Sequence, residues 1–197
     1  MSPRTSRTVT ERQRERHAAW LQGGRQGDGR LEVRDALLVR TRLGALDLRG
    51  ALFEGARLEG VDLGSARLQG SSFTGCELDT VSFLMAELSQ TTWTDCTFVR
   101  GRLGLSDAAG ITLLRCQLPE AELQRVRWTQ ARLTEVALTG ADLSGAELAG
   151  AVFQDCDLRN ADLNDAGLTG TLFHRCDLGG ARIDRRAAIL EDCRLDD

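Results

Sequence analysis

Apolar residues return at every fifth position over most of the chain. From Val33 to Ile183, each fifth residue is apolar, which gives 31 consecutive positions without an insertion. Thirty of these positions hold Leu, Phe, Trp, Val or Ile, and Ala108 is the exception. The spacing fits neither the 3.6-residue period of an amphipathic helix nor the two-residue period of a strand. It therefore indicates an internal repeat of five residues.

The other positions of each five-residue unit are also patterned. The residue two before each apolar centre is nearly always small or apolar, and the remaining three positions carry nearly all the charges. The units ADLSG, AELAG, CDLRN and ADLND resemble the pentapeptide-repeat family over about residues 31–185. That resemblance implies an all-β fold, a right-handed quadrilateral parallel β-helix in which four units make one coil. About eight coils are expected, with residues 20 apart stacked on one another.

Cysteine and aromatic positions agree independently with a 20-residue coil. Cys76, Cys96, Cys116, Cys156 and Cys176 are separated by 20, 20, 40 and 20 residues, and all lie two before a centre. The aromatic centres form a second such column, made of Phe53, Phe73, Trp93, Phe153 and Phe173. Each centre is therefore expected to point inward, buried because another coil stacks on it.

Both ends of a solenoid need a cover, and the sequence divides accordingly into residues 1–30, 31–185 and 186–197. Residues 1–30 are expected to form a basic arm and a capping helix over 11–22, because Thr10 and Gln13 make a capping box. Nucleic-acid binding by this Arg-rich arm is the alternative. Residues 186–197 are expected to fold over the last coil. The residues expected to cover the first coil are Ala18, Ala19, Trp20 and Leu21, and those expected to cover the last are Ala187, Ala188, Ile189 and Leu190.

The residues that could carry chemistry do not form a catalytic or metal site in this pattern. Zinc sites usually use CxxC spacing, whereas these cysteines form an inward line and are expected to be small buried thiols. His174 should point outward and Cys176 inward, so the two are not expected to meet as a nucleophile and base. We therefore expect no enzyme activity, no cofactor and no metal.

Composition indicates the class of protein and its expected location. The 197 residues carry a net charge of −4 and are 42% hydrophobic, which is typical of globular or repeat proteins. The N-terminus has no apolar signal segment and no run reaches the length of a membrane helix. The expectation is a cytoplasmic protein with reduced cysteines and no membrane contact.

Two sets of outward positions are candidate partner contacts. The apolar set lies at corners of the expected coils and consists of Leu84, Met85 and Leu105. The acidic set lies near the C-terminal end, where residues 140–165 hold Arg159 as their single basic residue. Its members are Asp142, Glu147, Asp155, Asp157, Asp162, Asp165 and Asp177.

The expected function is a rigid, non-enzymatic scaffold that binds another protein, as a monomer or weak dimer and without direct nucleic-acid binding. The alternative comes from the family resemblance, which implies a DNA mimic that binds DNA gyrase or another type II topoisomerase and protects it from antibiotic poisons. Residues 31–185 hold 22 acids against 16 Arg. Over a rod of roughly 37 Å that is about one net charge per 6 Å, against one per ~1.7 Å in duplex DNA. Mimicry would therefore depend on the local acidic set.

Overall fold

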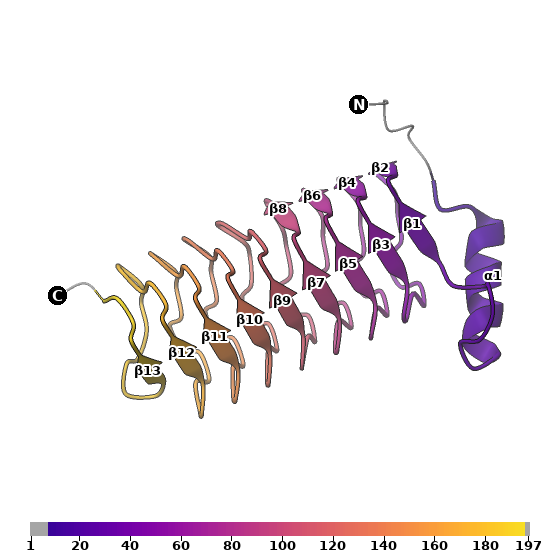
Figure 1. Ribbon diagram of the computed structural model, residues 1–197. Coiled ribbons are helices and arrows are strands. Elements are labelled where there is room, and N and C mark those ends of the chain that lie inside the picture. The colour runs from indigo at the N-terminus through magenta and orange to yellow at the C-terminus, as the bar shows by residue number, and fades with distance from the viewer. Residues whose placement is uncertain (1–7, 196–197) are drawn as a thin grey trace.

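The body of the protein is a stack of parallel coils with one helix across its N-terminal end (Figure 1). The computed structural model describes residues 8–195. Its elements, in chain order, are α1 (Glu11–Gln22), β1 (Glu32–Arg34), β2 (Leu37–Val39), β3 (Leu52–Glu54), β4 (Arg57–Glu59), β5 (Ser72–Thr74), β6 (Glu77–Asp79), β7 (Thr92–Thr94), β8 (Thr97–Val99), β9 (Thr112–Leu114), β10 (Arg132–Thr134), β11 (Val152–Gln154), β12 (Leu172–His174) and β13 (Ile189–Glu191).

The register of the coils follows the 20-residue offset that the sequence predicts. One nine-stranded sheet runs in the order β1-β3-β5-β7-β9-β10-β11-β12-β13, and a four-stranded sheet in the order β2-β4-β6-β8. All pairs are parallel, and Val33 of β1 pairs with Phe53 of β3. The other two faces are held by isolated parallel bridges such as Arg42 to Asp62. The predicted parallel β-solenoid is thus confirmed.

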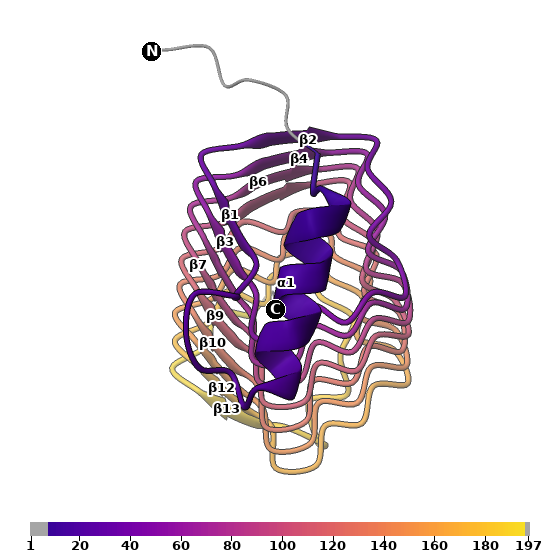
Figure 2. The same ribbon diagram turned by 90° about the vertical axis from the view of Figure 1, so that its right-hand side faces the viewer.

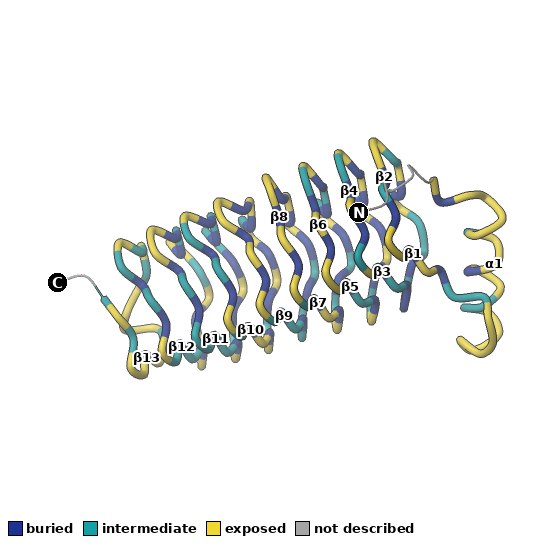
Figure 3. The backbone as a smooth tube through the Cα atoms, turned by 45° about the horizontal axis from the view of Figure 1, so that its top comes forward, coloured by how far each residue is buried: buried dark blue, intermediate teal, exposed yellow. Residues whose placement is uncertain are grey.

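The interior is filled by the apolar centres and the small residues that precede them. Buried and exposed positions alternate along every coil (Figure 3). The aromatic column stacks ring on ring, with centroids 4.5 Å apart for Phe53 and Phe73 and 4.3 Å apart for Phe73 and Trp93. Burial of one such side chain contributes about 1.5–3 kcal/mol. Stability therefore comes from this internal stack rather than from the short strands.

Each corner of a coil requires a left-handed backbone conformation. Every fifth residue from Asp35 to Gly180 has a positive φ, and most of these residues are not glycine. A left-handed conformation costs about 1–2 kcal/mol for a residue with a Cβ. Gly50 shows what glycine adds beyond this freedom, because a Cβ there would lie 3.3 Å from the Trp20 ring.

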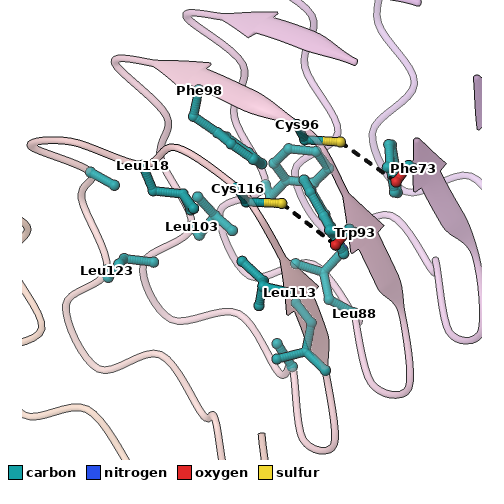
Figure 4. Close-up of a cluster of buried hydrophobic side chains, with 14 of the residues drawn as sticks. Phe73, Leu88, Trp93, Cys96, Phe98, Leu103, Leu113, Cys116, Leu118 and Leu123 are labelled. Carbon is teal, nitrogen blue, oxygen red and sulfur yellow. Dashed lines mark hydrogen bonds between the residues drawn. The ribbon is translucent and has the colours of Figure 1, made fainter. Parts of the chain in front are cut away.

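The thiol column has a structural role that the sequence did not reveal. Each thiol lies within hydrogen-bond range of two backbone carbonyls, and its one proton can be donated to either. One carbonyl belongs to the preceding coil, as in the 3.5 Å contacts of Cys96 Sγ with Phe73 O and Cys116 Sγ with Trp93 O (Figure 4), and the other lies two residues earlier in the chain. The contact with the preceding coil recurs at Cys76, Cys156 and Cys176. All six cysteines are free thiols. The cysteines therefore satisfy backbone acceptors inside the core.

Helix α1 lies across the open first coil (Figure 2). It begins at the predicted capping box, in which Thr10 N–H donates to Gln13 Oε1 at 2.9 Å. The expected packing residues are only partly correct, because Trp20 and Leu21 are half-buried whereas Ala18 and Ala19 are exposed. The fully buried residue of the helix is His17, 1% exposed. Part of the predicted basic arm, residues 1–7 with Arg4 and Arg7, lies outside the described residues.

The C-terminal segment covers the last coil as a further strand. Ala188 and Leu190 pack against the core as expected, whereas Ala187 and Ile189 are exposed. Strand β13 pairs in parallel with β12, and Leu190 is the partner of Phe173. The offset is 17 residues instead of 20, because three residues are missing between Ile183 and Leu190. Residues 186–195 therefore form one more layer of the solenoid. Leu190, Cys193 and Leu195 remain only half-buried because nothing in the described residues stacks beyond them.

Candidate interaction surface

The solenoid distributes the acidic candidate residues over several faces. Asp142 and Asp162 are adjacent rungs of one face, and Asp157 and Asp177 are adjacent rungs of the next. Glu147 lies on a third face, directly after Arg127. The remaining two candidates are at corners, where the φ of Asp155 is 53° and that of Asp165 is 58°. The structure therefore does not gather the seven acids on one surface.

Arginines from neighbouring positions compensate most of these carboxylates. Arg175 contacts both oxygens of Asp155 at 2.7 Å, and Arg159 binds Asp157 with contacts of 2.9 and 2.6 Å. Arg182 lies 3.4 Å from Asp162. The count along residues 140–165 missed Arg175 and Arg182 because they belong to the next coil, although both stand 20 residues after their partners.

A third arginine, Arg194, pairs with Asp177 and belongs to the shortened final layer. Asp177 Oδ2 lies 3.9 Å from Arg159 Nε and 3.8 Å from Arg194 Nη1. Arg194 follows Asp177 by 17 residues, so the regular 20-residue register does not find it. With these contacts, four of the seven candidate acids have arginine partners.

The ion pairs also shift the acidity of the carboxyl groups. The hydrogen bond from Arg159 is the main cause that lowers the pKa of Asp157 to about 2. The hydrogen bond from Arg175 likewise lowers the pKa of Asp155. Both groups therefore remain charged under all ordinary conditions, but each charge is shared with a cation and contributes little net potential at the surface.

Three acids have no ion pair within 4.0 Å among residues 8–195, namely Asp142, Glu147 and Asp165. Asp142 instead accepts from Gln124 Nε2 at 2.6 Å and from the backbone N–H of Ser144 at 3.0 Å. Desolvation opposes ionisation of Asp142, but these hydrogen bonds outweigh it and lower its pKa. The three candidate acids without an ion pair therefore lie near one corner of the coil, that of Gly145 and Asp165.

The apolar candidates and one of these acids share that corner. Met85 N–H donates to Gly104 O at 3.3 Å, and Leu105 N–H donates to Gln124 O at 3.0 Å. The same ladder continues through later coils at 20-residue steps. We call this corner column the Met85 edge; it consists of Ala45, Ser65, Met85, Leu105, Arg125, Gly145 and Asp165. Apolar and acidic candidates thus lie along one edge of the rod, the apolar pair in the middle and the acid toward the C-terminal end.

Side chains on the Met85 edge differ in exposure. Met85 is 55% exposed and Leu105 52% exposed, and both belong to the small group of large hydrophobic residues on the surface. Leu84, the third apolar candidate, is half-buried beside them. Above and below, the edge carries Ser65 and Arg125. The exposed pair is therefore an isolated apolar spot on a polar edge.

The cysteine and histidine that could have formed a catalytic pair make contacts in different directions. Cys176 Sγ points inward to Phe153 O at 3.4 Å, whereas His174 Nδ1 lies 3.4 Å from Glu191 Oε2. Within the described residues, no group of three or more His, Cys, Asp and Glu is placed to hold a metal ion. In the same part of the chain, no helix has the length and hydrophobicity of a membrane span.

The chain was compared with protein-family models, curated protein sequences and solved structures. A family model described as "Pentapeptide repeat region" matches residues 46–123 and 111–183. No curated protein sequence matches the chain.

The solved structures that are similar include pentapeptide repeat proteins. A trypsin-treated variant of QnrB1, a plasmid-mediated fluoroquinolone resistance protein, aligns with a TM-score of 0.55 at 18% identity, covering 84% of this chain and 91% of that one. A second trypsin-treated QnrB1 variant also gives 0.55, at 21% identity and 84% and 90% coverage. HetL, involved in heterocyst differentiation regulation in the cyanobacterium Nostoc sp. strain PCC 7120, gives 0.27 at 22% identity, with 90% and 92% covered.

Proposed function

Since the chain belongs to the pentapeptide-repeat family, we propose that it is a rigid, non-enzymatic scaffold whose Met85 edge binds another protein. The interior of the described coils is filled by buried side chains, so partners would meet the faces and edges of the solenoid. The role of the rod is then to hold a short row of side chains in fixed positions.

The observation that carries the proposal is the pair Met85 and Leu105. Their φ values are 56° and 58°, so each side chain stands on a left-handed residue that glycine would occupy more easily. Both side chains are also more than half exposed. Neither property helps the coil to fold, since Ser65 occupies the same column one coil earlier. Contact with a partner would give these two side chains the burial that the solenoid does not.

A second function, topoisomerase protection through DNA mimicry, is favoured by a different observation. Asp142, Glu147 and Asp165 have no arginine partner among residues 8–195, and they lie near the C-terminal end of the same edge. The fold likeness to QnrB1, described as a fluoroquinolone resistance protein, makes a type II topoisomerase the partner to test for this reading. The compensated charges of Asp155, Asp157, Asp162 and Asp177 weigh against a continuous DNA-like surface.

Site-specific photo-crosslinking tests the scaffold proposal. A photoreactive residue in place of Leu105 should crosslink to a protein partner in cells, whereas the same residue in place of Gln130, at a neighbouring corner, should not. The captured partner is then purified and its affinity measured for the wild type and for the double variant Met85→Ser and Leu105→Ser. Equal affinities of the two proteins would contradict the proposal.

A supercoiling assay with DNA gyrase and a fluoroquinolone tests the second function. Rescue or inhibition by the protein at micromolar concentration, lost in the triple variant Asp142→Asn, Glu147→Gln and Asp165→Asn, would support the mimic. If the wild-type protein has no effect in this assay, the DNA-mimic function is ruled out.

A further inference from the structure

A groove of about 710 Å³ separates one side of α1 from the first coil. We call it the cap groove; its walls include Val9, Arg14, His17 and Ala18 on the helical side and Leu46 and Leu48 on the coil. The volume falls within the range of small-molecule sites, which are mostly apolar and hold a few placed polar groups. It lies at the opposite end of the chain from the acidic set, and none of its lining residues belongs to the Met85 edge.

The protonation of His17 can be assigned from its hydrogen bond. The backbone N–H of Leu31 donates to His17 Nδ1 at 2.9 Å. Since a backbone N–H only donates, Nδ1 must carry the lone pair, and the proton of the neutral ring is on Nε2. The side chain is buried and stacks on Trp20 with centroids 5.4 Å apart, so its orientation is fixed. Nε2 has no hydrogen-bond partner among the described residues.

Arg14 lies one helical turn before His17 and also has a buried N–H group without a hydrogen-bond partner among the described residues. Its Nε is buried and also lacks a hydrogen-bond partner within residues 8–195. No carboxylate of these residues forms an ion pair with the Arg14 guanidinium. Glu11 and Glu15 also line the groove, and both are exposed. Side chains three positions apart on a helix are neighbours. Both residues line the cap groove, so its helical side carries two buried N–H donors without a partner among the described residues.

The missing group must therefore be an acceptor, and the charge of Arg14 favours an anion. The nearest acid on the coil is already engaged, because Asp47 Oδ2 lies 2.7 Å from Arg49 Nη2 and 3.3 Å from Arg67 Nη1. The rest of the groove offers apolar contact, with Leu48 and Val9 buried and Leu46 half-buried. A carboxylate accepts two N–H groups at once, and an aliphatic tail suits the leucine wall.

We propose that the cap groove binds a small aliphatic carboxylate, whose oxygens accept from Arg14 Nε and His17 Nε2 and whose tail lies against Leu46 and Leu48. Buried donors are normally satisfied in folded proteins. The bound carboxylate would supply an acceptor for the two donors, Arg14 Nε and His17 Nε2, that lack one among the described residues. Its binding would also strengthen the attachment of the capping helix to the first coil.

The test is a titration of the ¹⁵N-labelled full chain with hexanoate, followed by NMR. Binding is expected to shift the amides of Ala18 and Leu46–Leu48 saturably and to move the His17 Nε2–H signal. Hexan-1-ol, which keeps the tail without the carboxylate, should bind at least tenfold more weakly. A peptide ending in a free C-terminal leucine serves as the alternative source of a carboxylate.

The matched variants are Arg14→Met, which removes the donor and keeps the aliphatic stem, and Arg12→Met, on the exposed side of the helix. Arg14→Met should weaken hexanoate binding at least tenfold without lowering the melting temperature, and Arg12→Met should leave binding unchanged. In the titration, the proposal is overturned if hexanoate does not bind, if hexanol binds equally well, if the His17 signal does not move, or if only the peptide binds. In the comparison of variants, it is overturned if Arg14→Met and Arg12→Met have equal effects.

Discussion

The backbone N–H of Leu31 donates a 2.9 Å hydrogen bond to Nδ1 of the buried His17 ring. This bond ties the capping helix to the residue that leads into β1. It exists only while Nδ1 is unprotonated, because a protonated Nδ1 would face a second donor. The attachment of the cap is therefore linked to the charge of one histidine.

Acid should weaken the cap before it affects the coils. Burial is the main cause that lowers the pKa of His17 from 6.5; Asp47 acts in the opposite direction, while Arg30, Arg25 and Arg49 lower it further. Since the unfolded chain takes up a proton near pH 6.5 and the folded chain resists it, stability should be constant above that pH and fall below it. The slope should not exceed ~1.4 kcal/mol per pH unit. Urea unfolding between pH 7.5 and 5 measures it.

The matched control is His17→Gln, whose side-chain oxygen can accept from Leu31 without titrating. This variant should lose the slope between pH 6.5 and 5, whereas His174→Gln should keep it. The carboxylates whose pKa values are lowered, such as Asp95 and Asp157, lose their contribution only below pH 3.8, so the two windows are separate. A slope that survives in His17→Gln would contradict the assignment.

The final layer gives a second prediction, because its inward and outward positions are now known. Leu190 stacks on Phe173 and is half-buried, whereas Ile189 is 51% exposed on the outer side. Leu190→Asp should cost about 1–3 kcal/mol through loss of apolar contact and partial burial of a carboxylate. Ile189→Asp should stay within about 0.5 kcal/mol. Similar melting temperatures for the two variants would show that residues 186–195 do not continue the solenoid.

The thiol column gives a third prediction. Changing Cys76, Cys96, Cys116, Cys156 and Cys176 together to Ala removes five Sγ–H to carbonyl contacts and leaves small cavities. The protein should keep its circular dichroism spectrum and lose about 2–4 kcal/mol of unfolding free energy. Elemental analysis of the wild type should find no stoichiometric zinc. A variant that fails to fold, or bound zinc in the wild type, would give the thiols a larger role.

The body of the fold could be predicted because its rule is local and repeats. A centre at every fifth residue from Val33 to Ile183 fixes which side chains point inward, and Thr10 with Gln13 fixes where the helix begins. What escaped prediction depended on breaks in the repeat or on partners far along the chain. The three-residue shortening before Leu190 breaks the register, but the pattern resumes after it, with Leu190 and Leu195 five apart and Ala188 and Cys193 two before them. The burial of His17 depends on the angle at which a mostly polar helix crosses the first coil.

The sequence predicted which residues of the candidate surface are exposed, but not which of its charges are paired. Exposure of Met85 and Leu105 follows directly from their corner positions. Compensation of Asp155 by Arg175 could have been found by applying the 20-residue offset to charges as well as to centres. Compensation of Asp177 by Arg194 requires in addition the 17-residue offset of the final layer, which the resumed pattern at Leu190 and Leu195 indicates.

The last prediction separates stability from binding on the Met85 edge. The double variant Met85→Ser and Leu105→Ser should change the free energy of unfolding by less than about 1 kcal/mol, because both side chains are more than half exposed. Ser65 shows that serine is accommodated at this corner, with a φ of 56°. The same variant should weaken partner binding by about 1–3 kcal/mol, since buried apolar anchors dominate interface energies.

The control is Gln90→Ser and Gln130→Ser, two residues at a neighbouring corner with φ values of 59° and 57°. These substitutions repeat the backbone conformation, although the two residues lie two coils apart instead of one, and they remove no exposed apolar group. Isothermal titration should show unchanged partner affinity for them. If instead both double variants bind equally well while the triple acidic variant does not, electrostatic attraction rather than apolar contact recruits the partner. Its affinity should then fall steeply with added salt, because exposed charges are screened within about 10 Å at 0.1 M ionic strength.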